Sequence, residues 1–391
     1  MRQNKAPALT LMRKTRTKRA WLLAGVVLLI LLAIFWPRRV HRQPVSATTD
    51  LKRIQEQRLI IDVHEHIASL EEVPKMLAAM DAAGIGKTCL MGSSRFTLTL
   101  NPSVGFTGYD EVNEELMKIC EKYPDRFEAW PTLNPLDPDK LEKFSKLVDR
   151  GAKGLKLYLG HGYIVKKTNQ YMFHPVAMDD PGMLPVYQYC QDHFVPVCLH
   201  VNPSPKAPGF AQEFIAVLDA FPDMKVVCPH FMLSSILQTR LEEFLDTYPN
   251  LYSDISFGHD DFLSAGLRRI SKSPDKFRAL FNKYPTRFMY ATDLVVTPEA
   301  LKTVEWIHDR FRVYLDMLTQ TAYTTSVLPR EEFRGLALKT DLLERILYKN
   351  FQDFTALKPK GTKITRKIDW NRMGVTPINR KPGEAIPPPP L

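Results

Sequence analysis

The chain has 391 residues, of which 45% are hydrophobic and 25% are charged, and these proportions are ordinary for a globular protein. Its net charge of +10 is unevenly distributed: no Asp or Glu precedes Asp50, and the segment from Thr355 onward carries eight basic and two acidic residues, so the body between them is acidic. An acidic body excludes a nucleic-acid-binding domain, which needs a basic stripe on its folded surface, whereas the basic ends suit anionic lipid. Five scattered cysteines without a CxxC pair exclude a disulfide framework.

The N-terminal region contains an uncharged apolar run, Ala20–Trp36. As a helix it would reach roughly 25 Å, enough to span the core of a bilayer. Seven basic residues precede the run and three follow it closely, so the positive-inside rule places segment 1–19 in the cytoplasm and the rest of the chain on the extracytoplasmic (periplasmic or extracellular) side. We therefore predict a single-pass signal-anchor helix over 20–36. The alternative is a signal peptide cleaved near Ala47, which would release a secreted protein.

After a polar linker, 37–57, short apolar runs alternate with longer amphipathic stretches. The runs predict eight strands at Leu59–Val63, Thr88–Met91, Phe127–Pro131, Gly154–Leu159, Val195–His200, Lys225–Cys228, Leu251–Ile255 and Arg287–Ala291. The stretches predict helices at Val73–Ala83, Asp110–Tyr123, Asp137–Arg150, Leu184–His193, Ala211–Phe221, Ile236–Tyr248, Asp275–Tyr284 and Glu299–Leu318. Such alternation implies parallel strands joined by crossover helices, and eight units over about 250 residues have the size of a (β/α)₈ TIM barrel. We predict this α/β barrel for residues 58–354.

Two further helices are predicted near Arg330–Leu338 and Asp341–Asn350. The tail, 355–391, is rich in Pro, Lys and Arg and ends in PPPPL. This composition predicts an extended, poorly ordered segment.

Histidines and an aspartate stand at the ends of four predicted strands. The first strand runs into His64 and His66, whose i, i+2 spacing places both imidazoles on one strand face. His200 ends the fifth run, His230 the sixth and Asp293 the eighth. In a barrel all strand C-termini open onto one face, where catalytic residues gather. Buried ionisable groups are costly without a partner, so this set predicts a site for a divalent metal, with Zn²⁺ as the first expectation.

This pattern resembles the amidohydrolase superfamily, in which HxH follows strand 1, His follows strands 5 and 6, and Asp follows strand 8. Smaller similarities indicate the amidohydrolase-related branch, which includes lactonases and non-oxidative decarboxylases: Ile61-Asp62-Val63-His64, Gly151-Ala-Lys-Gly-Leu-Lys156-Leu-Tyr, Asn250-Leu-Tyr-Ser-Asp-Ile-Ser256 and Ile346-Leu-Tyr-Lys-Asn350. The resemblance covers about 58–354.

The resemblance implies roles for the strand-end residues. His64, His66 and His200 would hold the metal, and Asp293 would complete or flank the ligand shell. His230 would ligate a second ion or polarise the substrate carbonyl. Asp293 would also take a proton from the water that the metal activates and pass it to the leaving group.

Lys156 leaves the number of metal ions open. Its strand resembles the one on which dihydroorotase-like members carry a carbamylated lysine between two metals, but the Arg that those members place just after HxH is absent here. The alternatives are a lysine that binds a substrate carboxylate and one that pairs with a buried acid. Other candidate substrate-binding residues lie in loops at the expected mouth: Arg95, His161, Tyr163 and His259.

We expect an enzyme that hydrolyses an amide, lactone or ester bond of a small molecule. The first alternative is a non-oxidative decarboxylase of an aromatic or unsaturated acid on the same metal site. The second is a membrane-anchored barrel that binds without catalysis. A decarboxylase needs a cationic grip on the acid, for which Arg95 is the candidate. The oligomeric state stays open.

Overall fold

The computed structural model describes residues 49–384, apart from 161–163, 166–169, 172–175 and 234–236. The predicted anchor at 20–36 lies outside the described residues. Within the described part of the chain, no helix is long and apolar enough to cross a membrane.

Parallel strands form the centre of the fold. They are β1 (Ile60–Ile67), β2 (Ile85–Met91), β3 (Phe127–Trp130), β4 (Leu155–Gly160), β7 (Val197–Val201), β8 (Val226–Cys228), β9 (Leu251–Asp254), β10 (Phe288–Met289) and β11 (Val295–Val296). One sheet has the order β11-β1-β2-β3 and the other β10-β9-β8-β7-β4. Each of the eight predicted runs overlaps one of these strands, so the α/β prediction with parallel strands is confirmed.

Backbone hydrogen bonds join the two sheets at both edges. A parallel bridge pairs Thr132 with Lys156, whose N–H donates to Pro131 O at 2.9 Å. On the other side, the N–H of Val63 donates to Tyr290 O at 3.0 Å. This arrangement is consistent with the predicted barrel, and it directs the carboxyl ends of the strands to one face.

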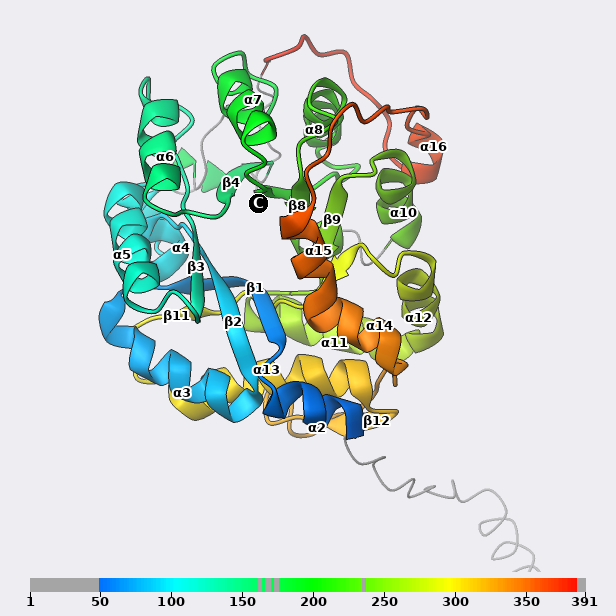
Figure 1. The fold of residues 1–391 in the computed structure, drawn as a ribbon. Coiled ribbons are helices and arrows are strands. Elements are labelled where there is room, and N and C mark those ends of the chain that lie inside the picture. Colours follow the sequence, from blue (N-terminus) through cyan, green and yellow to red (C-terminus); the bar gives the residue numbers. More distant parts are fainter. Residues whose placement is uncertain (1–48, 161–163, 166–169, 172–175, 234–236, 385–391) are drawn as a thin grey trace, which may run out of the picture. The chain divides into compact units, whose positions relative to one another are not determined.

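Helices surround the strands (Figure 1). Most follow a strand and cross back to the next one: α3 (Val73–Ala83), α5 (Tyr109–Lys122), α6 (Lys140–Asp149), α7 (Leu184–Asp192), α8 (Pro208–Ala220), α10 (Gln238–Thr247), α11 (Asp260–Lys272), α12 (Pro274–Lys283) and α13 (Val304–Thr319). Shorter ones are α4 (Arg95–Thr99), α9 (Pro229–Met232), α14 (Thr340–Glu344) and α15 (Asn350–Ala356), with a π-helical turn at Arg345–Lys349 between the last two. Their apolar faces pack on the strands, and buried Phe, Leu, Ile and Val side chains fill the core.

Two segments differ from the sequence-based expectation. The predicted linker ends in a helix, α2 (Thr49–Glu56), because Leu51 and Ile54 are buried against the core and Arg53 pairs with Glu344. We had predicted a helix over 330–338, but this region is not helical. It contains β13 (Glu332–Arg334), which pairs antiparallel with β12 (Ala322–Thr324), and the rings of Phe333 and Tyr323 stack at 5.4 Å.

The basic tail follows a defined path as far as Glu384, which differs from the expected poor order. It includes α16 (Trp370–Met373), and Arg372 contacts Glu243 and Asp246 on α10. Arg380 forms two hydrogen bonds, of 2.6 and 2.8 Å, with the buried carboxylate of Asp179. Residues 355–384 follow this path because their basic side chains meet acidic partners on the outside of the barrel, which composition alone does not reveal.

Glu213 on α8 gives the fold a testable dependence on pH. Burial raises the pKa of its carboxyl to about 7, although its Oε2 accepts a hydrogen bond from Met178 N. Between about pH 4.5 and 7 the folded chain keeps a proton that the unfolded chain releases, so stability falls as pH rises through this window.

Glu213→Gln removes this ionisation and can keep the hydrogen bond. We expect the variant to match the parent near pH 4 and to exceed its free energy of unfolding by roughly 2–3 kcal/mol at pH 8, since one pKa unit corresponds to about 1.4 kcal/mol. Denaturant unfolding at both pH values measures this. Equal stability of the two proteins at pH 8 would contradict it.

Candidate metal centre

His64 and His66 lie within β1, which continues past the predicted end of the first strand. The continuation follows from backbone pairing with the segment between β10 and β11: the N–H of Asp293 donates to His64 O, and the N–H of His66 donates to Leu294 O, each at 2.8 Å. The intervening Glu65 points the other way, where it accepts hydrogen bonds from Thr292 and Leu294 N. This alternation brings both imidazoles to the same side as Asp293.

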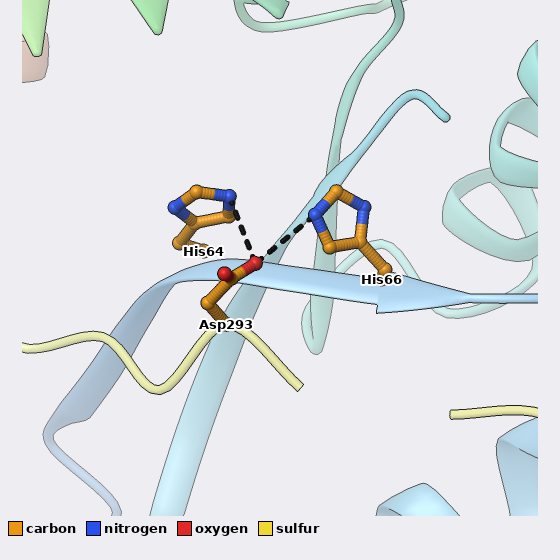
Figure 2. Close-up of side chains that lie close together, drawn as sticks. All are labelled: His64, His66 and Asp293. Atoms are coloured by element: carbon orange, nitrogen blue, oxygen red, sulfur yellow. Dashed lines mark ion pairs between the residues drawn. The ribbon is translucent and has the colours of Figure 1, made fainter. Parts of the chain in front are cut away.

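One carboxylate oxygen of Asp293 meets both imidazoles (Figure 2). Asp293 Oδ1 lies 3.2 Å from His64 Nε2 and 3.1 Å from His66 Nε2. Among the described residues, these three form the group whose ligand atoms lie within 4.8 Å of one another, as a shared metal ion requires. Asp293 adopts a left-handed φ of 57°, a conformation that Asp tolerates better than most residues.

The outer nitrogen of each imidazole is held by an acceptor. His64 Nδ1 lies 3.0 Å from Asp254 Oδ2, and His66 Nδ1 lies 3.2 Å from the carbonyl of Met91 and 2.6 Å from Ser93 Oγ. Because a carboxylate and a carbonyl can only accept, each Nδ1 carries the proton. When both imidazoles are neutral, as metal binding requires, their Nε2 atoms direct lone pairs toward the Asp293 carboxylate. Two nitrogen lone pairs and an anionic oxygen repel one another unless a cation joins them, so these residues fit a divalent metal.

Asp254 is a functional residue to which the sequence reasoning gave no role. It ends β9, and its Oδ1 accepts from the backbone N–H groups of His230 and Ser256 and from Ser256 Oγ at 2.6–3.0 Å. Since the Ser256 hydroxyl donates to Asp254, Ser256 Oγ accepts from His230 Nδ1 at 2.8 Å. A single carboxylate thus orients both His64 and His230. The signal in the sequence was an acid at the end of the seventh apolar run, within the motif that ends in Ser256.

The charges of the site follow from these contacts. Burial, with a contribution from nearby Lys156, lowers the pKa of His64 to about 4, so this imidazole is neutral at pH 7. Burial opposes ionisation of Asp293 and Asp254, but the histidines around each carboxyl hold its pKa below the usual value. Both acids are therefore carboxylates at neutral pH.

His230 follows β8 in a left-handed turn. The φ angles of His230, Phe231, Met232 and Leu233 are 61°, 53°, 52° and 50°. Each such residue costs about 1–2 kcal/mol relative to a right-handed conformation, so the surroundings must hold the turn in place. The bond from His230 N to Asp254 does this from one side and the buried Phe231 ring does it from the other. The turn directs His230 Nε2 to within 3.5 Å of Asp293 Oδ2.

The remaining predicted ligands lie close by. The ring of His200 on β7 contacts that of His230 with centroids 5.0 Å apart. Lys156 on β4 is buried, with Nζ 2.9 Å from His64 Nε2 and 3.6 Å from Cys198 Sγ. Lys156 Nζ therefore lies against the same Nε2 atom that a metal ion would bind. The two-metal alternative would need its amine to be carbamylated.

A cavity of about 580 Å³ opens onto this group. All the predicted metal ligands line it, as does His259, whose side chain caps α11 and is half exposed. Arg95 does not line it: α4 turns this side chain outward toward Glu111 on α5, at 3.9 Å. Arg95 is therefore not placed to bind a substrate in this cavity. His161 and Tyr163 lie outside the described residues.

The amidohydrolase family model matches residues 61–350, and no curated protein matches. Solved structures include a 2,6-dihydroxybenzoate decarboxylase from Rhizobium (19% identity; 77% of this chain and 99% of that one; TM-score 0.45). A 4-oxalomesaconate hydratase from Rhodopseudomonas palustris has 14% identity over 76% of this chain and 95% of that one, with a TM-score of 0.46. An amidohydrolase II has 18% identity over 76% of this chain and 100% of that one, with a TM-score of 0.48.

The reactions named for these structures differ from one another. The family model spans well over half of the sequence and includes every strand that bears a predicted ligand. This chain belongs to the amidohydrolase family.

Proposed function

We propose that the chain is a metal-dependent hydrolase that cleaves an amide, lactone or ester bond. The observation that carries the proposal is the convergence of His64 Nε2, His66 Nε2 and Asp293 Oδ1 at the inner end of the cavity. A divalent ion bound there would polarise the substrate carbonyl and lower the pKa of water toward about 7. The mixed N and O donor set suits Zn²⁺.

In this proposal, His64, His66 and Asp293 hold the ion and His200 completes the shell. The second oxygen of Asp293, which faces His230, accepts the proton of the attacking water and delivers it to the leaving group. His230, whose Nδ1 donates to Ser256, presents Nε2 to the cavity as a ligand for a second ion or as a hydrogen-bonding group. In the one-metal form the ion takes the single lone pair of His64 Nε2, so Lys156, whose Nζ lies 2.9 Å from this atom, has to turn to another acceptor.

The decarboxylase alternative needs a cation to hold the substrate acid. Arg95, the candidate from the sequence, points away from the cavity. Arg310 lines the cavity, but its guanidinium is bound to Asp260 by hydrogen bonds of 2.6 and 2.8 Å. Arg95 and Arg310 are therefore poorly placed for this role, and the candidates that remain in the lining are Lys156 and Arg269.

A panel of lactones, N-acyl amides, aryl esters and hydroxybenzoates tests the proposal on the full chain. We expect release of acid from a lactone, amide or ester, loss of that activity with a chelator, and its recovery on adding Zn²⁺ or Mn²⁺. Carbon dioxide from a hydroxybenzoate without acid release from the other compounds would establish the decarboxylase instead. Turnover of no compound by metal-loaded protein would favour the binding barrel.

We also propose that residues 20–36 anchor the enzyme in a membrane with the barrel on the extracytoplasmic side. The support is the charge asymmetry around the apolar run. Protease added to intact cells or spheroplasts should remove the barrel and leave the N-terminal segment. A soluble chain that begins near Ala47 would show that the run is a cleaved signal peptide.

A further inference from the structure

Large apolar side chains are exposed at the cavity that leads to the metal centre. Among the described residues, the four most exposed large hydrophobic side chains are Leu301 (69%), Phe262 (66%), Leu136 (62%) and Leu100 (58%). Three of the four, Leu100, Phe262 and Leu301, line this one cavity, and we call them the apolar rim. Exposed apolar groups that gather around a concave site mark a surface that is covered when a ligand binds.

The rim is assembled from three separate segments. Leu100 caps α4, Phe262 lies in the first turns of α11, and Leu301 lies in the loop before α13. Phe96, Phe257 and Trp306 continue the apolar lining of the same cavity. The apolar surface therefore does not come from one helix face, because three separate segments contribute to it.

The charged groups of this wall largely neutralise one another. Arg310 is bound to Asp260 by two hydrogen bonds and lies 3.6 Å from the centroid of the Trp306 ring. Lys302 lies 3.6 Å from Glu299. Arg269 adds one more cation to the lining. A wall built mainly from paired charges and apolar side chains binds a ligand through apolar contact area rather than through a complementary charge.

The volume of the cavity exceeds the space that the cleaved group of a substrate would occupy. A cavity of about 580 Å³ has room for roughly 19 water-sized groups at about 30 Å³ each. Metal ligands line one part of it, and the apolar rim lines another. A ligand that fills the cavity has a polar, cleavable group next to Asp293 and an apolar remainder against Leu100, Phe262 and Leu301.

We propose that the substrate carries an extended aliphatic arm, such as an acyl or alkyl chain, which the apolar rim binds. The proposal rests on the hydrolase function proposed above and names the substrate class of that site. It predicts that the specificity constant rises with chain length, because burial of each added methylene improves binding by about two- to fourfold until the rim is covered.

The test uses p-nitrophenyl esters with straight acyl chains of 4, 6, 8 and 10 carbons and the full-length, metal-loaded protein. We expect kcat/KM for the longest ester to exceed that for the shortest by about 50-fold or more, given several methylenes at the above factor each. Phe262→Ser combined with Leu301→Ser should reduce this ratio below about tenfold. Leu136→Ser is the matched control: it removes an equally exposed leucine outside the cavity and should leave the ratio unchanged. Long esters partition into detergent to the same extent in the assays of all variants. The comparison between variants therefore measures the contribution of the apolar rim.

Binding of straight-chain carboxylates of 4 to 10 carbons, measured by calorimetry on the same proteins, provides a readout that does not depend on hydrolysis. An affinity that rises with chain length in the parent and in Leu136→Ser, but not in the rim variant, supports the proposal. If this result is found and no ester is cleaved, the aliphatic arm stands and only the proposed hydrolysis fails. Ester hydrolysis whose rate is the same for all chain lengths, or a length dependence that the rim variant keeps, would overturn the aliphatic arm while the hydrolase stands. Carboxylate binding that is independent of length would overturn it as well.

Discussion

Asp293→Asn should reduce kcat by about a thousandfold, within the range of 10²- to 10⁴-fold that a positioned proton-transfer group contributes. The carboxylate contacts three imidazoles, two through Oδ1 and one through Oδ2, and it remains charged because those histidines hold its pKa low. The amide of Asn keeps the shape and tolerates the left-handed backbone, so the barrel should fold normally. The Asn amide cannot accept a proton at neutral pH. Its NH₂ group would face either an imidazole nitrogen or the metal ion.

Steady-state kinetics with whichever substrate the panel identifies, together with a thermal unfolding curve, measure this effect. Asp261→Asn is the matched control, because Asp261 is 94% exposed on the neighbouring α11 and does not line the cavity. A folded Asp293→Asn variant with kcat within tenfold of the parent would remove Asp293 from the reaction.

Asp254→Asn should weaken metal binding by about 10- to 100-fold, the usual effect of losing a carboxylate that orients a ligating histidine. Asp254 Oδ1 accepts from the backbone N–H of His230, from Ser256 N and from Ser256 Oγ, and its Oδ2 faces His64 Nδ1. An Asn that keeps its oxygen toward the three donors turns its NH₂ group to His64. The imidazole then has to accept at Nδ1, which moves its proton to Nε2 and removes the lone pair that the metal needs.

Competition with a chelator of known affinity measures the metal dissociation constant. Asp179→Asn is the control for the general cost of changing a buried aspartate, since Asp179 pairs with Arg380 on the tail and should affect only stability. Unchanged metal affinity in Asp254→Asn would mean that the tautomer of His64 is set by other groups.

The sequence predicted the strands and the residues at their ends because both follow from local pattern. Each of the eight apolar runs overlaps a strand, and the i, i+2 spacing of His64 and His66 places both imidazoles on one face. The parallel order then brings Asp293 and His230 beside them without further information.

Features that depend on tertiary contacts were not predictable in this way. The left-handed turn after His230 is occupied by Phe231, Met232 and Leu233, where glycine would have signalled it. Arg95 points outward because the short helix α4 begins at that residue, and α2 forms because two of its apolar side chains reach the core. The tail is ordered by acids that are more than 100 positions away in the sequence.

Metal content tests the central claim most directly. The parent chain and His64→Ala/His66→Ala are purified in parallel, dialysed against trace Zn²⁺ and Mn²⁺, and analysed by plasma mass spectrometry. We predict one equivalent of metal in the parent, or two if Lys156 is carbamylated. We predict less than about a tenth of an equivalent in the double variant, because His200 and Asp293 alone are fewer than the three protein ligands of a catalytic metal site. Circular dichroism must show that both chains are folded. Equal metal content in the two proteins, or none in the folded parent after reconstitution, would contradict the metal centre described here.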